Sequence, residues 1–355
     1  PYAKLITQLF GDRMYIANAT GCSSIWGNSS PSTPYTVNEK GQGPAWSNSL
    51  FEDNAEFGYG MLLAQKALRN GLKAKVEKLV ESGDNEAVVA AGKEWLETFN
   101  CGATNGTATD NLVAALEACD CGCELRKEIL QNKDFLAKKS QWIFGGDGWA
   151  YDIGFGGVDH VLASGQDINI MVFDTEVYSN TGGQSSKSTP TGAIAQFAAG
   201  GKEVKKKDMA SIAMSYGYVY VAQIAMGADF NQTVKAIAEA EAYPGPSLII
   251  AYAPCINHGI KKGMSKAQTE EQLAVECGYW NNFRFNPAAE GAKFTLDSKE
   301  PKMEGYKDFL NGEVRYNSLA RFYPEKAEVL FAKNESEAKD RYEYLKKLVT
   351  LYGAE

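Results

Sequence analysis

The sequence predicts an α/β protein built on a doubly wound, mostly parallel sheet. Four short runs are almost continuously apolar, and helical patterns separate them: residues 142–144, 168–174, 219–222 and 247–252. Strands that are apolar on both faces and alternate with helices are typical of a parallel sheet covered by helices on both sides. In addition, polar or thiol residues follow several of these strands, where ligands bind in such sheets.

The expected elements follow in chain order. A strand over residues 12–21 precedes a polar, proline-containing loop that reaches about residue 48. Apolar residues at three- to four-residue spacing then predict a helix over residues 51–70. The helices expected between and after the apolar strands cover residues 155–163, 193–199, 208–216, 229–242 and 266–276. A loop-rich stretch and a charged helix over residues 335–352 complete the chain.

Residues 72–138 differ from the rest because they are rich in Lys and Glu. They contain helix-like stretches at 73–82, 85–100, 111–119 and 124–137, which we interpret as a helical insert on the surface. Residues 291–355 are expected to form a helical C-terminal extension. The whole of 1–355 is therefore expected to be one domain with these two additions.

Composition excludes several classes of protein. The 355 residues are 44% hydrophobic and 23% charged, as in an ordinary globular protein. No apolar run approaches the about 20 residues of a membrane span, and no secretory signal stands at the start. The net charge of −8 argues against nucleic-acid binding. The basic cluster at 202–207 favours a solvated loop or helix face, with a docking patch for an acidic partner or an anionic cofactor tail as the alternative.

The seven cysteines are an odd number and mostly scattered, so a disulfide framework is not expected. Free thiols or metal ligands in a reducing cytoplasm fit better. The cluster Cys119, Cys121 and Cys123 could hold a metal, although solvent-facing or buried thiols are the ordinary alternative. Of the two histidines, His160 is expected to pack, and His258 is a weak candidate for a contact near the substrate.

Asp147, in the run Gly145–Gly148, closes the strand at 142–144, and Thr175 and Val177 follow the strand at 168–174. A carboxylate and a polar turn residue at adjacent strand ends suit Mg²⁺, which prefers oxygen ligands and takes the rest from phosphates. Glycines allow backbone N–H groups to approach a diphosphate. Together with the loop that begins at Asn180, this pattern points to a thiamine diphosphate (ThDP) site.

Competing phosphate-binding motifs fail at defined positions. A dinucleotide fingerprint starting at Gly146 would need glycine at position 151, which is Tyr151, and one starting at Gly154 would need glycine in place of Asp159. Lys202 lacks the earlier glycine and the following Ser or Thr of a P-loop. Cys22 and Cys255 also follow expected strands. Buried thiols are one reading of them, and ligands of a metal or cluster are the other, although two thiolates cannot complete a four-thiolate site.

Four segments in order give the chain a specific resemblance to pyruvate:ferredoxin (flavodoxin) oxidoreductases, over nearly its whole length. They are residues 18–27 (Asn-Ala-Thr-Gly-Cys-Ser-Ser-Ile-Trp-Gly), 146–149 (Gly-Asp-Gly-Trp), 174–184 and 253–255 (Ala-Pro-Cys). The chain is similar to the C-terminal ThDP-binding domain of that large multidomain enzyme. The resemblance implies a sheet of the ThDP-binding type.

The resemblance assigns Mg²⁺ to Asp147, Thr175 and the carbonyl of Val177. It assigns cofactor contacts to Cys22, Gly146, Asp147, Gly148, Trp149, Thr175, Glu176, Val177, Tyr178, Ser179 and Asn180. Asn180 would lie near the reactive thiazolium and orient substrate. Cys22 and Cys255 would be two of four ligands of a [4Fe-4S] cluster. The other two would belong to a Cys-x-x-Cys segment before Pro1, and a glutamate that activates the cofactor would belong to another domain.

The function implied by this resemblance is oxidative decarboxylation of a 2-oxo acid, most simply pyruvate, with coenzyme A as acyl acceptor. Electrons would pass through the cluster to ferredoxin or flavodoxin, in a cytoplasmic homodimer of which this chain is an incomplete part. One alternative is a non-oxidative ThDP decarboxylase or carboligase, which would leave Cys22 and Cys255 without a role. Another is a non-catalytic interaction or electron-carrier module that retains the fold.

Overall fold

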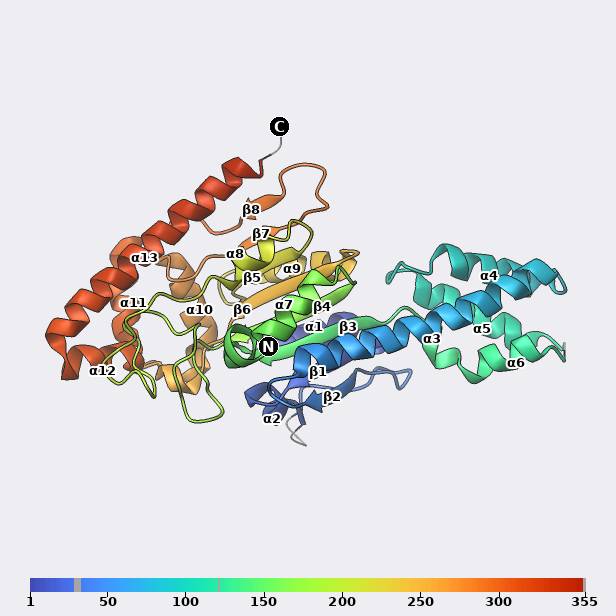
Figure 1. The fold of residues 1–355 in the computed structure, drawn as a ribbon, viewed down its shortest axis with the longest axis horizontal. Coiled ribbons are helices and arrows are strands. Elements are labelled where there is room, and N and C mark those ends of the chain that lie inside the picture. Colours follow the sequence, from blue (N-terminus) through green and yellow to red (C-terminus); the bar gives the residue numbers. More distant parts are fainter. Residues whose placement is uncertain (29–32, 121, 354–355) are drawn as a thin grey trace.

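The computed structural model describes residues 1–28, 33–120 and 122–353. Within these residues the strands form one eight-stranded sheet in the order β2-β1-β3-β4-β6-β5-β7-β8 (Figure 1). The strands are β1 (Met14–Ala19), β2 (Ala45–Ser49), β3 (Ser140–Gly146), β4 (Ile168–Asp174), β5 (Tyr220–Ile224), β6 (Pro246–Tyr252), β7 (Phe283–Phe285) and β8 (Phe294–Leu296). All pairings among β1 to β6 are parallel, whereas β7 pairs antiparallel with both β5 and β8.

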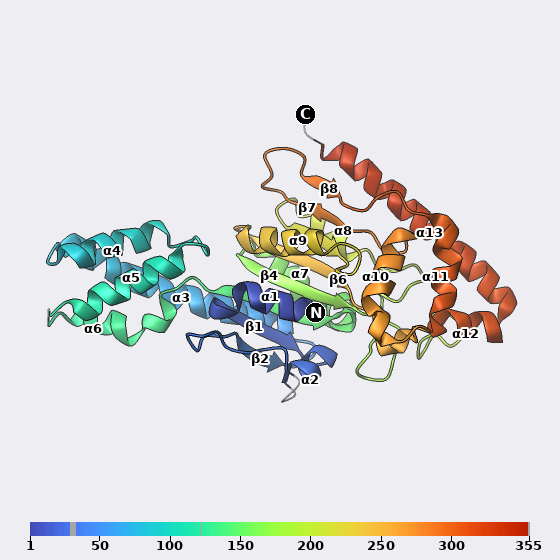
Figure 2. The same ribbon diagram turned by 180° about the vertical axis from the view of Figure 1, so that it is seen from behind.

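The sheet is buried on both faces, which confirms the predicted doubly wound α/β class. On one face, buried side chains of the first part of α3 (Asn54–Ser82), of α7 (Phe155–Ala163) and of α8 (Met209–Met214) form one core. On the other, α1 (Tyr2–Phe10) and α9 (Phe230–Ala242) form a second core (Figure 2). All residues of β4 and β6 are buried, which explains their continuous apolar character.

Several predicted elements are confirmed closely, including the strand at 168–174 and the helix at 155–163. The helix expected over residues 193–199 is wrong. The backbone N–H of Ile194 donates to the carbonyl of Arg315 at 2.9 Å, and that of Gln196 donates to Gly183 at 2.8 Å. Hydrogen bonds to distant segments therefore replace those of a helix, despite the alanine-rich sequence. No sequence pattern predicted α1, β2 or α2 (Cys22–Asn28).

A helical arm extends from the sheet (Figures 1 and 2). The helix α3 is continuous over 29 residues, so the stretches expected at 51–70 and 73–82 are one element. Its outer half packs with α4 (Glu86–Glu97), α5 (Asn105–Ala118) and α6 (Glu124–Gln131) around a third core that includes Leu72 and Trp95. The helical character of 72–138 is confirmed, whereas an insert boundary at residue 72 stays a prediction.

The C-terminal region is more helical than expected. After α10 (Ala267–Glu276), the stretch expected to be mostly loop contains β7, β8, α11 (Tyr306–Gly312) and α12 (Val314–Phe322). The last helix, α13 (Pro324–Leu351), starts 11 residues before the predicted position, with proline in its first turn. Buried side chains of α11, α12 and α13 belong to the same core as those of α8. In the described part of the chain, no helix has the length and apolar character needed to cross a membrane.

Candidate functional site

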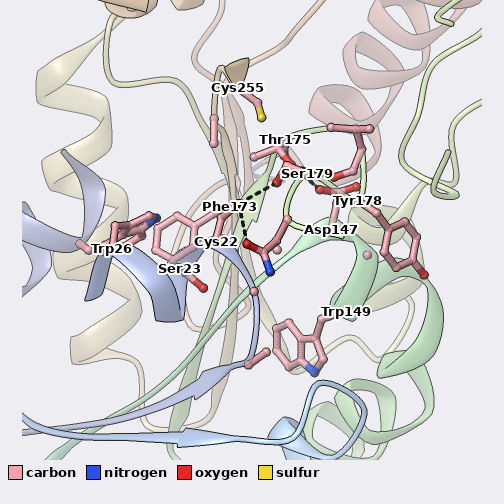
Figure 3. A pocket seen from close by; sticks show the side chains of 18 of the residues that line it. Cys22, Ser23, Trp26, Asp147, Trp149, Phe173, Thr175, Tyr178, Ser179 and Cys255 are labelled. Carbon is pink, nitrogen blue, oxygen red and sulfur yellow. Dashed lines mark hydrogen bonds between the residues drawn. The ribbon is translucent and has the colours of Figure 1, made fainter. Parts of the chain in front are cut away.

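The carboxyl ends of the parallel strands surround a cavity of about 430 Å³. Its walls include four residues that the sequence places just after strands, Cys22, Asp147, Thr175 and Cys255 (Figure 3). Asn180, which follows the same strand as Thr175, also lines the cavity. These residues come together because the four strands that precede them are parallel and point their ends at one edge. All the predicted cofactor contacts line this cavity except Glu176.

Asp147 is 1% exposed and stands at the start of a π-helical turn, Gly148–Ile153. Its Oδ1 accepts hydrogen bonds from the backbone N–H of Thr175 at 3.2 Å and from the Thr175 hydroxyl at 2.8 Å, and its Oδ2 accepts one from the Ser186 hydroxyl at 2.6 Å. Burial and the nearby charge of Asp174 raise the pKa of Asp147 to about 7, although the hydroxyl donors act against this. Ser186 was not predicted, because no local pattern links it to Asp147.

Three oxygen atoms gather at this point. The Thr175 Oγ1 lies 2.8 Å from Asp147 Oδ1 and 3.0 Å from the carbonyl oxygen of Val177. Its single hydroxyl proton can satisfy only one of these acceptors at a time. Adjacent oxygens around an octahedral Mg²⁺ lie about 2.9 Å apart, because each Mg–O bond is about 2.1 Å. The distances from the Thr175 hydroxyl to the other two oxygens therefore match those between adjacent ligands of such a coordination shell.

Two glycines next to Asp147 make room for aromatic rings rather than for a ligand. A Cβ on Gly145 would lie 2.3 Å from the ring of Trp149, and one on Gly148 would lie 2.6 Å from the ring of Tyr178. At Gly146, by contrast, the nearest atom to such a Cβ is the carbonyl oxygen of Phe173 at 3.8 Å. The close packing of the two rings fixes the wall of the cavity beside Asp147.

The two strand-end cysteines lie on the wall of the cavity. Cys22 Sγ is 3.2 Å from the Ser179 hydroxyl and 3.9 Å from the Asn180 side-chain oxygen. The Cys255 sulfur accepts from the backbone N–H of Asn257 at 3.5 Å, and burial raises the pKa of this thiol. Among the residues that the structure describes, no three His, Cys, Asp or Glu side chains form a group that could hold a metal unaided.

Two aromatic residues of the cavity wall, Trp26 and Phe173, were not predicted. Trp26 and Phe173 meet edge to face at 5.8 Å between ring centroids, and both line the cavity. Phe173 appears in the sequence as an ordinary strand residue, and Trp26 as part of a loop. Their shared position depends on how α2 lies against the strand ends.

Behind the Thr175–Val177 turn lies a charged network that no local sequence pattern predicts. Lys206 donates to Asp174 at 2.8 Å and to Glu176 at 2.9 Å, so the prediction of a solvated basic cluster is wrong for this residue. Burial alone would lower the pKa of Lys206, but the two carboxylates raise it above its ordinary value. Arg315 pairs with Glu176 at 2.8 Å and with Glu313 at 2.7 Å.

The two histidines differ in role. His258 is fully buried, and its Nε2 is 2.7 Å from the carbonyl oxygen of Thr175, so it supports the turn rather than lining the cavity. His160 is exposed and packs edge to face against Tyr59, as expected. Of the cysteine cluster in the arm, Cys119 is buried and Cys123 partly buried, and Cys121 lies outside the described residues. The possible metal site there stays untested.

Comparison with known proteins gives consistent matches. The family model "Thiamine pyrophosphate enzyme, C-terminal TPP binding domain" matches residues 122–251. The chain is 58% identical over 351 residues to the pyruvate-flavodoxin oxidoreductase of Klebsiella pneumoniae, covering 98% of this chain and 30% of that protein. It is also 58% identical over 356 residues to the pyruvate:ferredoxin oxidoreductase of Moorella thermoacetica, with 98% and 30% covered.

A solved structure of the 2-oxoglutarate:ferredoxin oxidoreductase of Magnetococcus marinus aligns at a TM-score of 0.41 and 13% identity, over 72% of this chain and 62% of that chain. A likeness at this level supports no further conclusion. The chain spans about 30% of the length of the sequence relatives named above. On these sequence matches, the chain belongs to the family of pyruvate-flavodoxin and pyruvate:ferredoxin oxidoreductases, as a partial sequence that carries the thiamine pyrophosphate-binding domain.

Proposed function

We propose that this chain holds the diphosphate of ThDP through a divalent cation, bound by Asp147, Thr175 and the Val177 carbonyl. The observation that carries the proposal is the set of three oxygens spaced 2.8 and 3.0 Å apart at the floor of the cavity. Mg²⁺ suits such a set, because it takes few protein oxygens when phosphates complete its shell. The family match to a thiamine pyrophosphate-binding domain supports the same assignment.

The activity we propose for the whole enzyme is CoA-dependent oxidative decarboxylation of pyruvate, with ferredoxin or flavodoxin as electron acceptor. When bound, ThDP supplies the carbon nucleophile that adds to the 2-oxo acid and the electron sink that carboxylate loss requires. The residues of this chain anchor the cofactor and exclude water from it through Trp149 and Phe173. Asn180, on the rim, would orient the substrate through its amide.

We further propose that Cys22 and Cys255 bind a [4Fe-4S] cluster, with two more thiolates supplied from outside this chain. Both sulfurs belong to residues that line the cavity, so a cluster held there would stand next to the cofactor. This feature favours the oxidative reaction over a non-oxidative ThDP decarboxylase or carboligase, in which the two thiols have no task. The cavity in turn argues against a non-catalytic electron carrier, which would need no site for ThDP.

We propose that residues 1–355 act as one ThDP- and Mg²⁺-binding unit of a larger cytoplasmic homodimer, with a helical insert at 72–138 and an extension at 291–355. The net charge of −8 supports partners other than nucleic acid.

The test uses the full-length protein and the variant Asp147→Asn. We expect ThDP with Mg²⁺ to raise the unfolding temperature of the wild type and to leave that of the variant unchanged, because the variant lacks the anionic oxygen that the cation needs. Asp229→Asn is a matched control, since Asp229 caps α9 away from the cavity. Calorimetric titration measures the binding. A wild-type protein that failed to bind ThDP with Mg²⁺ would contradict the proposal.

The oxidative part has a separate readout. The full-length wild type should be brown and should reduce a ferredoxin or flavodoxin when given pyruvate and coenzyme A. The variant Cys255→Ala should lose iron and colour but still bind ThDP, because its thiol would hold the cluster and not the diphosphate. A colourless wild type that releases CO₂ without an electron acceptor would instead favour the non-oxidative enzyme.

A further inference from the structure

Glu176 stands between the two neighbouring oxygen donors of the proposed cation site. Its φ of +58° lies in the left-handed region, which residues other than glycine rarely adopt. Here the Thr175 hydroxyl and the Val177 carbonyl oxygen are 3.0 Å apart. The unusual conformation of Glu176 therefore accompanies the close approach of the two donors.

The side chain of Glu176 faces away from the cofactor cavity. It is 1% exposed overall and lines a second cavity of about 440 Å³ on the other side of the turn. There Oε1 accepts from Lys206 at 2.9 Å, and Oε2 accepts from Arg315 at 2.8 Å and from the Tyr279 hydroxyl at 2.6 Å. None of these three partners lines the first cavity. The carboxylate is thus fully engaged in contacts that hold it in place.

The backbone of Glu176 is held as firmly as its side chain. Its N–H donates to Asp174 Oδ1 at 3.1 Å, and its carbonyl oxygen accepts from the Thr189 hydroxyl at 2.6 Å. One residue earlier, His258 contacts the carbonyl oxygen of Thr175. Strained backbone conformations persist only where the surroundings determine them from several sides, and this turn meets that condition.

We propose that Glu176 is a positioning residue for the divalent cation: its clamped carboxylate holds the left-handed turn that sets the Thr175 hydroxyl beside the Val177 carbonyl. The inference rests on the proposed cation site and adds to it a residue that does not touch the cation or the cofactor. The same geometry gives Glu176 no part in proton transfer to a substrate, because its carboxylate opens onto the other cavity.

The experiment measures Mn²⁺ binding by electron paramagnetic resonance in the full-length protein, at a fixed concentration of ThDP. Glu176→Ala removes the clamp and leaves a residue that resists the left-handed conformation. We expect it to raise the Mn²⁺ dissociation constant about 10–100-fold, the usual effect of losing a residue that orients metal ligands. Glu176→Gly also removes the clamp but adopts this conformation freely, so its loss of affinity should be smaller.

Glu241→Gln is the matched control. Glu241 is also a largely buried carboxylate with an arginine partner, Arg13 at 2.8 Å, but it contacts Ser140 and Asn169 at the opposite ends of β3 and β4. This variant should lower the unfolding temperature and leave Mn²⁺ affinity unchanged. Wild-type Mn²⁺ affinity in folded Glu176→Gly, or in folded Glu176→Ala, would overturn the inference. A wild type that binds no Mn²⁺ in the presence of ThDP would instead overturn the proposed cation site itself.

Discussion

Glu176 and Lys206 illustrate at the scale of single residues how charge is accommodated in this fold. Burial alone would raise the pKa of Glu176, but Lys206, Arg315 and His258 outweigh it and lower the pKa to about 2. Glu176 and Lys206 both stay ionised, because each has an oppositely charged partner within 3 Å. Removing one member of such a group typically costs about 3–5 kcal/mol, because the other charges lose their compensation.

The cysteines give a prediction at the same scale. Cys101 is exposed, and hydrogen bonds involving Thr104 lower the pKa of its thiol, so more of it is thiolate at neutral pH. Burial raises the pKa of Cys277 to about 12. We therefore expect iodoacetamide at neutral pH to alkylate Cys101 rapidly and to leave Cys277 unmodified, as measured by peptide mass spectrometry. Denaturant should abolish the difference, and equal labelling of both thiols in the folded protein would contradict the prediction.

At the scale of elements, α3 contributes side chains to two cores, and its glycines differ in how closely other residues approach them. Gly60 is exposed, and a Cβ there would have no neighbour within 4 Å. A Cβ on Gly58 would lie 2.5 Å from Ile143 and 3.0 Å from Ala17 in the sheet. The first position favours any better helix former, whereas the second requires glycine because the helix approaches the strands closely.

We expect Gly60→Ala to raise the free energy of unfolding by about 1 kcal/mol, the difference in helix propensity between alanine and glycine. Gly58→Ala should lower it by about 1–3 kcal/mol, because the added methyl group displaces packed side chains. Denaturant unfolding of the two variants beside the wild type measures both effects. If both variants changed the free energy of unfolding in the same direction, α3 would not pack as described.

Among the secondary-structure elements, the buried strands could be predicted from the sequence, whereas an edge strand and two short helices could not. Strands β3, β4, β5 and β6 were predicted because each is buried on both faces and therefore apolar throughout. The edge strand β2 was missed, since its residues are exposed or half-buried and its sequence is typical of a loop. The short helices α1 and α2 were missed as well. The candidate site followed the strands: Asp147, Thr175, Cys22 and Cys255 were found because each follows a buried strand.

At the scale of the whole molecule, the arm has a core of its own. Trp95 is fully buried there, meets Phe99 edge to face at 5.1 Å and donates a hydrogen bond to Thr109 at 3.2 Å. None of the three residues belongs to the cores that pack against the sheet. The arm and the cofactor cavity are therefore stabilised by separate sets of contacts.

Trp95→Ala should consequently destabilise the arm by about 3–5 kcal/mol through the cavity it creates. Amide hydrogen exchange should accelerate in α4, α5 and α6 while β3 and β4 remain protected, and ThDP with Mg²⁺ should bind as in the wild type. Phe283→Ala, in the core that packs on the sheet, is a control that should destabilise the sheet region instead. Loss of ThDP binding in Trp95→Ala would mean that the arm supports the cavity.

The sequence by itself determined the α/β class, the positions of the central strands along the chain and the residues at their carboxyl ends. These features depend on local apolar runs and on the rule that parallel strands end at one edge. Only the tertiary structure decided which side chains stand behind the site. Arg315 reaches Glu176 across 139 residues of sequence, and His258 reaches Thr175 across 83. Such partners leave no local pattern, because a charge becomes buried and paired only when distant segments pack together.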